Sequence, residues 1–325
     1  MARIAVLGAG AWGTALALQG LRAGADVALW ARDAGRAAEM IATRENARYL
    51  PGIPLPPALR VTADAAAALD GAALALLVVP VQGLRAVLGS LPAAPVPILV
   101  CAKGVEAATG ALPLEILAEL RPGPAGVLSG PNFAVEVARG LPAAAVVASA
   151  DAALRTNALA LLAGPSFRLY GNDDAIGAQV GGAAKNVIAI AAGAVIGAGL
   201  GENARAALVT RGLAELSRLT VALGGRAETA AGLSGLGDLM LTTAGAGSRN
   251  MSLGLALGRG ETLASILAGR AGVTEGVATA PALVARAHAA GVELPLCEAV
   301  ADLLEQRISL PDAISRLMAR PLRDE

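Results

Sequence analysis

The sequence predicts an α/β protein whose N-terminal part is a doubly wound sheet and whose C-terminal part is all-helical. Up to about residue 178, short continuous apolar runs alternate with helix-like segments, which is typical of a parallel sheet covered by helices on both faces. Beyond that residue, long Ala- and Leu-rich segments broken by glycine replace the β-branched runs and indicate helices alone. We therefore expect two domains, residues 1–178 and residues 179–325.

Six apolar runs are the expected strands of the first domain, since each is short, continuous and bounded by turn-forming residues. They are RIAVLG (residues 3–8), ADVALW (25–30), ALALLVVP (73–80), PILVCAK (97–103), GVLSG (126–130) and AAAVVAS (143–149). The proline-rich stretch LPGIPLPPAL, residues 50–59, is expected to be an ordered loop.

Composition restricts the kind of partner. The 325 residues are 55% hydrophobic and only 2% aromatic, so small aliphatic side chains packed against glycine must build the core. The 26 Lys and Arg residues balance 26 Asp and Glu residues, which leaves no net charge to attract nucleic acid or an anionic membrane. We expect a small-molecule partner. The apolar helical half is compatible with a homodimer as well as with a monomer.

Cysteine and histidine usage excludes other chemistries. Cys101 and Cys297 lie far apart in apolar segments, too few for a disulfide framework or a thiolate metal site, so no metal is expected. His288 is the only histidine and lies in a helix-like surface segment, which argues against histidine-based catalysis. MARIAVLGAG already reads as a strand entering a glycine turn, so we expect no signal peptide and a cytoplasmic protein.

The lysines are unusual in number. Only Lys103 and Lys185 are lysines, and the other 24 cationic residues are arginines. A buried lysine can lose its proton near neutral pH, whereas arginine stays charged. Each lysine is therefore either retained by chance or retained because it transfers a proton. Lys185 is the one formally charged residue between Ala175 and Gly201, a segment too interrupted and too rich in Ala and Gly for a membrane span. We expect a buried core helix there.

The segment GAGAWGTALA follows the first expected strand and opens a helix, which is the context required of a GxGxxG dinucleotide-binding turn. Gly8 permits the tight turn, Gly10 lets the backbone approach a pyrophosphate, and Gly13 allows close packing of helix on sheet. The first domain is therefore expected to be Rossmann-like and to bind a dinucleotide at the N-terminus of this helix.

The residue after the second strand indicates which dinucleotide is bound. An NAD-selective site commonly places a carboxylate there, whereas this chain has Ala31 and Arg32, and an arginine suits a 2′-phosphate. NADP is therefore favoured over NAD. Asp33, one residue later, is a carboxylate of the kind that an NAD-selective site uses, so NAD stays an alternative.

Four features of the sequence offer chemistry for a substrate. Lys103 follows a strand, at the sheet edge where doubly wound folds bind ligands, although a solvated strand end explains it too. Lys185, among apolar neighbours, must meet an anion, lose its proton, or do both. In GLSGLGDLMLT, Asp238 is an isolated carboxylate behind three glycines, either a partner for a lysine or a structural cap. GSRN, residues 247–250, can hold a phosphate at a helix N-terminus or act as an ordinary cap.

Several longer blocks occur together in a family-like order. They are GAGAWGTALA, RYLPGIPLP, CAKGVE, SGPNFAVEVA, GGAAKNVIAIAAG, GENARAALVTRGLAE, GLSGLGDLMLT, SRN and TEGV. In order and spacing they resemble the bacterial NAD(P)-dependent glycerol-3-phosphate dehydrogenases, over nearly the whole chain. The resemblance implies an oxidoreductase that transfers a hydride between NAD(P)H and dihydroxyacetone phosphate to give sn-glycerol 3-phosphate for glycerophospholipid synthesis.

The resemblance also implies site residues. Lys185 corresponds to the proton donor, with Lys103 and Asp238 as the other catalytic candidates. Implied cofactor contacts, together with the glycine turn, are Gly8, Gly10, Ala11, Trp12, Gly13, Arg32, Tyr49, Lys103, Ala134, Arg249, Val273 and Glu275. Implied substrate contacts are Lys103, Gly130, Asn132, Lys185, Asn186, Asp238, Ser248, Arg249 and Asn250.

Two departures and two alternatives accompany the resemblance. Asn132 stands where the family usually has Ser or Thr, and we expect its amide to donate in their place. The loop TTAGAGSRN carries an extra glycine, which indicates a loop that orders on phosphate binding.

One alternative is another lysine-dependent NADPH reductase of the ketopantoate reductase or 6-phosphogluconate dehydrogenase type. The other is a non-catalytic dinucleotide-sensing protein.

Overall fold

The chain divides into two compact units in the computed structural model, which describes residues 1–245, 247–269 and 273–320. The first unit comprises Met1–Lys103 and Pro113–Ala178, and the second comprises Gly104–Leu112 together with Gln179–Glu325. Residues 104–112 thus cluster with the second unit although they lie within the first 178 residues.

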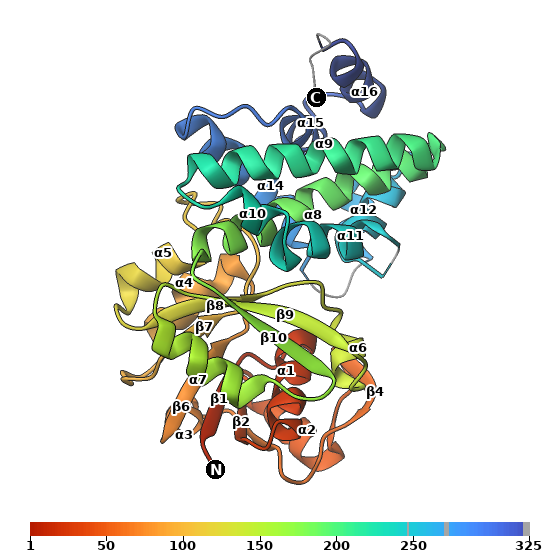
Figure 1. The fold of residues 1–325 in the computed structure, drawn as a ribbon. Helices are drawn as coiled ribbons and strands as arrows, with labels where there is room; N and C mark the ends of the chain where they lie inside the picture. The colour runs from red at the N-terminus through yellow and green to blue at the C-terminus, as the bar shows by residue number, and fades with distance from the viewer. Residues whose placement is uncertain (246, 270–272, 321–325) are drawn as a thin grey trace. The chain divides into compact units, whose positions relative to one another are not determined.

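An eight-stranded sheet forms the centre of the first unit, with helices on both of its sides (Figure 1). In spatial order its strands are β10 (Phe167–Asn172), β9 (Ala143–Ala148), β8 (Ala125–Ser129), β7 (Ile98–Val100), β6 (Ala72–Leu77), β1 (Arg3–Leu7), β2 (Asp26–Trp30) and β5 (Arg60–Thr62). The central strands are apolar on both faces because both are covered; residues 4–7 of β1, for example, are all fully buried. The doubly wound sheet expected from the apolar runs is confirmed.

Most helices of the first unit begin at an aspartate cap or next to a proline. They are α1 (Ala11–Arg22), α2 (Ala34–Thr43), α3 (Ala65–Leu69), α4 (Val81–Ser90), α5 (Pro113–Leu120), α6 (Ala134–Ala138) and α7 (Ala152–Leu162). Asp33, Asp64 and Asp151 cap α2, α3 and α7, each carboxylate accepting backbone N–H groups of the first turn. α1 packs against α6 and α7, and α4 packs against α5.

Strand direction departs from a purely parallel sheet at one place. β9 runs antiparallel to β8, and β10 runs parallel to β9. The connection from β8 to β9 contains only the five-residue helix α6, which at about 1.5 Å per residue is too short to carry the chain back along the sheet for a parallel return. β10 was not among the expected strands, because FRLYGN alternates buried and exposed residues at the sheet edge instead of forming an apolar run.

The stretch expected as a proline-rich loop, residues 50–59, is partly a strand. β4 (Leu50–Pro54) pairs antiparallel with β3 (Glu45–Asn46) in a separate two-stranded sheet. Gly52 supplies a left-handed residue with φ of +73°, which lets the chain turn between the two prolines of β4.

All regular structure described in residues 179–320 is helical, as expected. The helices of the second unit are α8 (Ala175–Gly197), α9 (Gly201–Ala222), α10 (Ala227–Ala230), the π-helical turn η1 (Leu233–Gly237), α11 (Asp238–Thr243), α12 (Arg249–Gly258), α13 (Leu263–Ala268), α14 (Glu275–Ala289), α15 (Pro295–Leu304) and α16 (Leu310–Met318). α8 is long and apolar enough to cross a membrane, but 83% of its most apolar window is buried by other residues, as befits a core helix.

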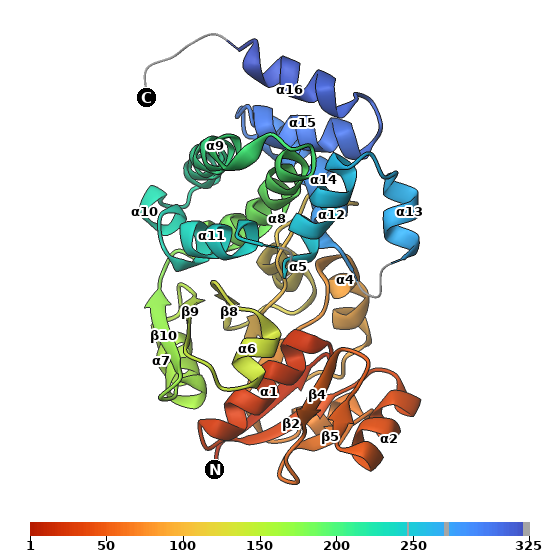
Figure 2. The ribbon, with the colours of Figure 1, turned by 90° about the vertical axis from the view of Figure 1, so that its right-hand side faces the viewer.

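Helices α8 and α12 lie side by side (Figure 2) and approach through two Gly-xxx-Gly pairs. The glycines are Gly193 and Gly197 on α8 and Gly254 and Gly258 on α12. A Cβ atom on Gly254 would lie 2.0 Å from the backbone oxygen of Ile190, and one on Gly193 would lie 2.1 Å from that of Met251. Any side chain would push the helices apart, so these glycines fix the second half of α12 against the C-terminal part of α8.

Candidate functional site

The glycine turn between β1 and α1 has the form that a dinucleotide phosphate needs. Gly8 has a φ of +121°, and a Cβ there would lie 2.3 Å from the backbone oxygen of Val78. A Cβ on Gly13 would lie 1.8 Å from the oxygen of Gly8. Gly10, which precedes the first turn of α1, has no atom within 4 Å of its Cβ position. The turn is thus closed behind Gly8 and Gly13 and open at Gly10, where the N–H groups of the helix begin.

Two side chains that the sequence did not single out hold this turn. Asn46 is buried, and its Nδ2 donates to the backbone oxygen of Ala9 at 3.0 Å and to Thr14 Oγ1 at 2.8 Å. Arg36 donates to the same Ala9 oxygen at 3.2 Å. Asn46 ends the two-residue strand β3, and no periodic pattern in the sequence marks it as a buried residue.

The end of β2 presents arginines next to an aromatic ring. Arg32 is exposed, while the Asp33 carboxylate accepts the backbone N–H of Arg36 at 2.8 Å as the cap of α2. The Arg36 guanidinium lies 4.4 Å from the centre of the Tyr49 ring, and that of Arg48 lies 5.5 Å from it. Asp33 is therefore engaged in capping, and the exposed charge that directly follows β2 is positive.

Lys103 lies three residues beyond β7, and its Nζ donates to the backbone oxygen of Gly130 at 3.0 Å. Gly130 follows β8 with a φ of +140°, so the turn there favours glycine. Asn132 Nδ2 donates to the backbone oxygen of Ala144 at 3.0 Å, and its buried Oδ1 has no hydrogen-bond partner among the described residues. The Asn132 amide nitrogen thus donates within the first unit, and the buried atom left without a partner among the described residues is an acceptor.

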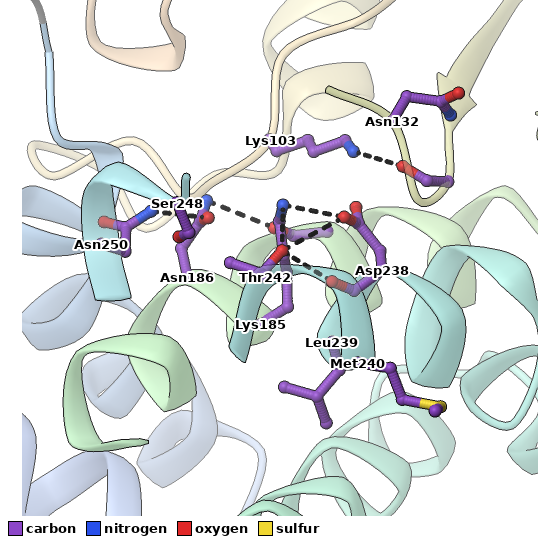
Figure 3. Close-up of polar contacts among 12 residues, drawn as sticks. Lys103, Asn132, Lys185, Asn186, Asp238, Leu239, Met240, Thr242, Ser248 and Asn250 are labelled. Carbon is purple, nitrogen blue, oxygen red and sulfur yellow. Dashed lines mark hydrogen bonds and ion pairs between the residues drawn. The ribbon is translucent and has the colours of Figure 1, made fainter. Parts of the chain in front are cut away.

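In the second unit, Lys185 and Asp238 form an ion pair. Lys185 Nζ donates to Asp238 Oδ1 at 2.9 Å, and the two side chains are 12% and 1% exposed (Figure 3). Lys185 also donates to Thr242 Oγ1 at 2.9 Å, and that hydroxyl donates to the backbone oxygen of Asp238 at 2.6 Å. The anion expected near Lys185 is present, and Thr242 was missed, although its i+4 spacing from Asp238 puts it on the same helix face.

Glycines bring Asp238 to Lys185. A Cβ on Gly181 of α8 would lie 2.5 Å from the backbone oxygen of Ser234, and one on Gly235 would lie 2.0 Å from that of Ala230. Both contacts involve η1, which ends directly before Asp238. π-Helical turns are rare and often occur at functional sites. The missing side chain at Gly181 thus lets η1, and with it the start of α11 at Asp238, lie against α8.

A chain of amide contacts lies beside this pair. Asn250 Nδ2 donates to Asn186 Oδ1 at 2.8 Å, and the backbone N–H of Gly276 donates to Asn250 Oδ1 at 3.0 Å. Asn186 and Asn250 are both buried. The Ser248 hydroxyl caps α12 by accepting the N–H of Met251 at 3.2 Å. The implied residues Ser248 and Asn250 thus lie at the start of α12, where Asn250 contacts Asn186 of α8. The contribution of Gly276 was missed.

The remaining implied residues divide between the units. Ala11, Trp12 and Ala134 begin α1 and α6 in the first unit. Arg249 begins α12 in the second unit, Glu275 begins α14, and Val273 is exposed shortly before it. In the glycine-rich loop before Ser248, Ala246 lies outside the described residues.

A dinucleotide turn on a doubly wound sheet and a paired, largely buried lysine in a helical unit define the class of nicotinamide-dependent oxidoreductases. Family models described as the N-terminus and the C-terminus of NAD-dependent glycerol-3-phosphate dehydrogenase match residues 3–155 and 174–315. The chain belongs to this family, as its sequence blocks predicted.

Individual relatives agree over the full length. The chain is 58% identical over 322 residues to glycerol-3-phosphate dehydrogenase (NAD(P)+) of Acidiphilium cryptum, covering 99% of this chain and 98% of that protein. It is 54% identical over 324 residues to the Gluconobacter oxydans protein of the same name, covering 98% and 97%. The crystal structure of glycerol-3-phosphate dehydrogenase from Coxiella burnetii matches with a TM-score of 0.93 at 39% identity, covering 98% and 99% of the two chains.

Proposed function

We propose that this protein reduces dihydroxyacetone phosphate reversibly to sn-glycerol 3-phosphate with NAD(P)H, and that this product is used for glycerophospholipid synthesis. The observation that carries the chemistry is the largely buried Lys185, held by Asp238 and Thr242 at 2.9 Å each. Reduction of a ketone adds a hydride to carbon and a proton to oxygen. The nicotinamide supplies the hydride, so the protein must supply the proton and stabilise the developing alkoxide.

Lys185 is the group proposed to supply that proton. The Thr242 hydroxyl uses its hydrogen on the Asp238 carbonyl, so it accepts from Lys185, as does the Asp238 carboxylate. Two neighbouring acceptors, whose oxygens lie 3.3 Å from each other, fix the direction of Nζ, which is the geometry required of a proton donor that acts on one oxygen. In the reverse reaction the same amine takes the proton from the alcohol.

The first unit is proposed to bind the cofactor and the second to carry the substrate chemistry, with residue 178 as the boundary. The open backbone at Gly10 fits a pyrophosphate. The residues proposed to contact the cofactor are Gly8, Gly10, Ala11, Trp12, Gly13, Arg32, Tyr49, Lys103, Ala134, Arg249, Val273 and Glu275. NADP is the proposed preference, because Arg32 is exposed beyond β2 and the Asp33 carboxylate is occupied as a helix cap.

The residues proposed to contact the substrate are Lys103, Gly130, Asn132, Lys185, Asn186, Asp238, Ser248, Arg249 and Asn250. The capped N-terminus of α12, with the guanidinium of Arg249, suits a phosphate. Contacts to the phosphate, at a distance from the carbonyl, use the binding energy of the phosphate to orient the reacting carbon.

We propose a cytoplasmic location, with which the two free, buried cysteines agree. A homodimer stays a prediction, and light scattering after size-exclusion chromatography tests it directly.

Substrate profiling tests the function. Purified protein should oxidise NADPH rapidly with dihydroxyacetone phosphate and reduce NADP with sn-glycerol 3-phosphate. The absorbance of the reduced nicotinamide follows both reactions. Ketopantoate is the matched control, and turnover of ketopantoate without turnover of dihydroxyacetone phosphate would overturn the proposal.

A further inference from the structure

Gly276, at the start of α14, lies at one end of a hydrogen-bond chain that reaches the residue next to Lys185. The chain runs from the Gly276 N–H to Asn250 Oδ1 at 3.0 Å, and from Asn250 Nδ2 to Asn186 Oδ1 at 2.8 Å. It joins three helices, α14, α12 and α8, and both asparagines are buried. The links to Asn186 are drawn in Figure 3.

The backbone N–H sets the polarity of this chain. A side-chain amide can present either its oxygen or its nitrogen to a neighbour, but a backbone N–H can only donate. The Asn250 atom that faces Gly276 must therefore be its oxygen, which leaves the Asn250 nitrogen facing Asn186. The Asn186 atom that meets this nitrogen must be an oxygen, so the Asn186 nitrogen points to the other side.

Only one further contact of the Asn186 nitrogen is present among the described residues. It lies 3.5 Å from the backbone oxygen of Gly182, one helical turn earlier on α8, at the outer limit of a hydrogen bond. Figure 3 draws this contact on the side of Asn186 away from Asn250. Asn186 thus has a strongly held oxygen and a weakly held pair of N–H donors.

Packing leaves no room for another residue at position 276. A Cβ there would lie 2.6 Å from Asn250 Oδ1, 2.8 Å from Ile190 Cδ1 and 2.9 Å from the backbone oxygen of Asn186. These distances are too short for any side chain, so Gly276 permits the close approach of its N–H to Asn250.

We propose that Gly276 is a positioning residue for the reaction: its backbone N–H orients the Asn250 amide and, through it, the Asn186 amide, so that Asn186 offers a hydrogen-bond donor to an oxygen of the substrate. Asn250 acts in this way by its side chain, through Asn186. The inference rests on the proposed function only in the identity of the substrate, a hydroxyketone phosphate whose oxygens accept hydrogen bonds.

Asn250→Asp is the decisive variant, because its new carboxyl changes between two states. Ionised, it still accepts the Gly276 N–H but cannot donate to Asn186 Oδ1; protonated, it can do both. Relative to unmutated protein at the same pH, kcat/KM for dihydroxyacetone phosphate should fall about 10- to 100-fold at pH 8, the loss of a buried hydrogen bond, and recover as the pH is lowered. Asn250→Ala should show the loss without recovery.

Asn186→Asp separates the donor from the hydrogen-bond chain. Its carboxylate accepts from Asn250 Nδ2 as the amide oxygen does, so the hydrogen-bond chain should be kept, while kcat falls at least about 10-fold because the donor to substrate is gone. The buried carboxylate should lower the thermal unfolding midpoint, so kcat is measured well below that midpoint. Gly276→Ala should lower activity as well. Gly269→Ala is its matched control, since the nearest atoms to that Cβ position are 3.9 Å away.

The outcomes separate this inference from the proposed function. Turnover of dihydroxyacetone phosphate by the unmutated protein tests the function alone. If that turnover is present but the Asn250→Asp defect is independent of pH, or Asn186→Asp is as active as the unmutated protein, the positioning role is wrong and the amides serve only to hold the helices together.

Discussion

Lys185 Nζ lies 2.9 Å from Asp238 Oδ1, although the two residues are 53 positions apart and belong to different helices. The contact depends on Gly181, whose lack of a side chain lets the turn before Asp238 touch α8. A charged pair so little exposed requires mutual compensation, because either charge alone would lose its hydration without gaining a partner.

Replacing Lys185 tests its chemical role. Lys185→Met removes the proton donor, and Lys185→Arg keeps the charge in a group that does not release a proton near neutral pH. Both variants should lower kcat about 100- to 10,000-fold, the usual contribution of general acid catalysis. Steady-state assays with dihydroxyacetone phosphate and NADPH measure this; an arginine variant with unchanged kcat would show that charge alone suffices.

Breaking the pair from the other side should reduce stability. Asp238→Asn leaves the ammonium of Lys185 without its carboxylate, and the free energy of unfolding should fall by about 3 kcal/mol. The double variant Lys185→Met/Asp238→Asn is the control and should regain most of that loss, since no buried charge remains. Urea denaturation of the three proteins measures both changes, and an equally unstable double variant would contradict the argument.

The glycine contacts between α8 and α12 should not tolerate a methyl group. Gly254→Ala places a Cβ 2.0 Å from the backbone oxygen of Ile190 and should cost about 2 kcal/mol or more. Gly89→Ala is the matched control, because that glycine lies in α4 with no atom within 4 Å of its Cβ position. The control should be neutral or up to about 1 kcal/mol more stable, through higher helix propensity. Chemical denaturation distinguishes the two.

Arg32 should decide the choice between dinucleotides. Arg32→Ala removes the exposed cation that follows β2, so KM for NADPH should rise about 10- to 100-fold, the loss of a charged hydrogen bond, while KM for NADH changes little. Asp33→Ala is the comparison. It removes a helix cap and should cost about 1 kcal/mol of stability without changing the ratio of the two KM values. Equal effects of Arg32→Ala on both cofactors would exclude the 2′-phosphate contact.

Glu215 should make stability depend on pH. Burial raises the pKa of this carboxyl, although the backbone N–H groups of Leu296 and Cys297 donate to it at 2.7 and 3.2 Å and oppose the shift. A raised pKa in the folded state means that the folded protein holds the proton more tightly. The stability it contributes is present below the unfolded pKa and is lost as the pH rises through the folded pKa.

Glu215→Gln removes that titration. The unmutated protein should therefore lose stability relative to the glutamine variant as the pH is raised from about 4, near the unfolded value, towards neutrality. Urea denaturation at several pH values measures the difference. A constant difference across that range would mean that Glu215 does not titrate there.

Local patterns in the sequence were sufficient wherever a feature depends on neighbours in the chain. The glycine turn, the buried strands and the helical second half follow from residues a few positions apart. β10 was missed because FRLYGN is an edge strand with one exposed face, and its apolar signal is correspondingly weak. Asn46 and Thr242 were missed because their partners are defined by contact between distant segments.

The sequence by itself determined which groups carry chemistry: two lysines among 26 cations, an isolated Asp238, and glycines at the positions that later proved to be close contacts. Only the tertiary structure decided how these groups are oriented. The direction of the Lys185 amine and the polarity of the Asn186 amide depend on hydrogen bonds between helices. Such bonds arise when packing brings distant backbone and side-chain atoms within about 3 Å, and no local pattern encodes that distance.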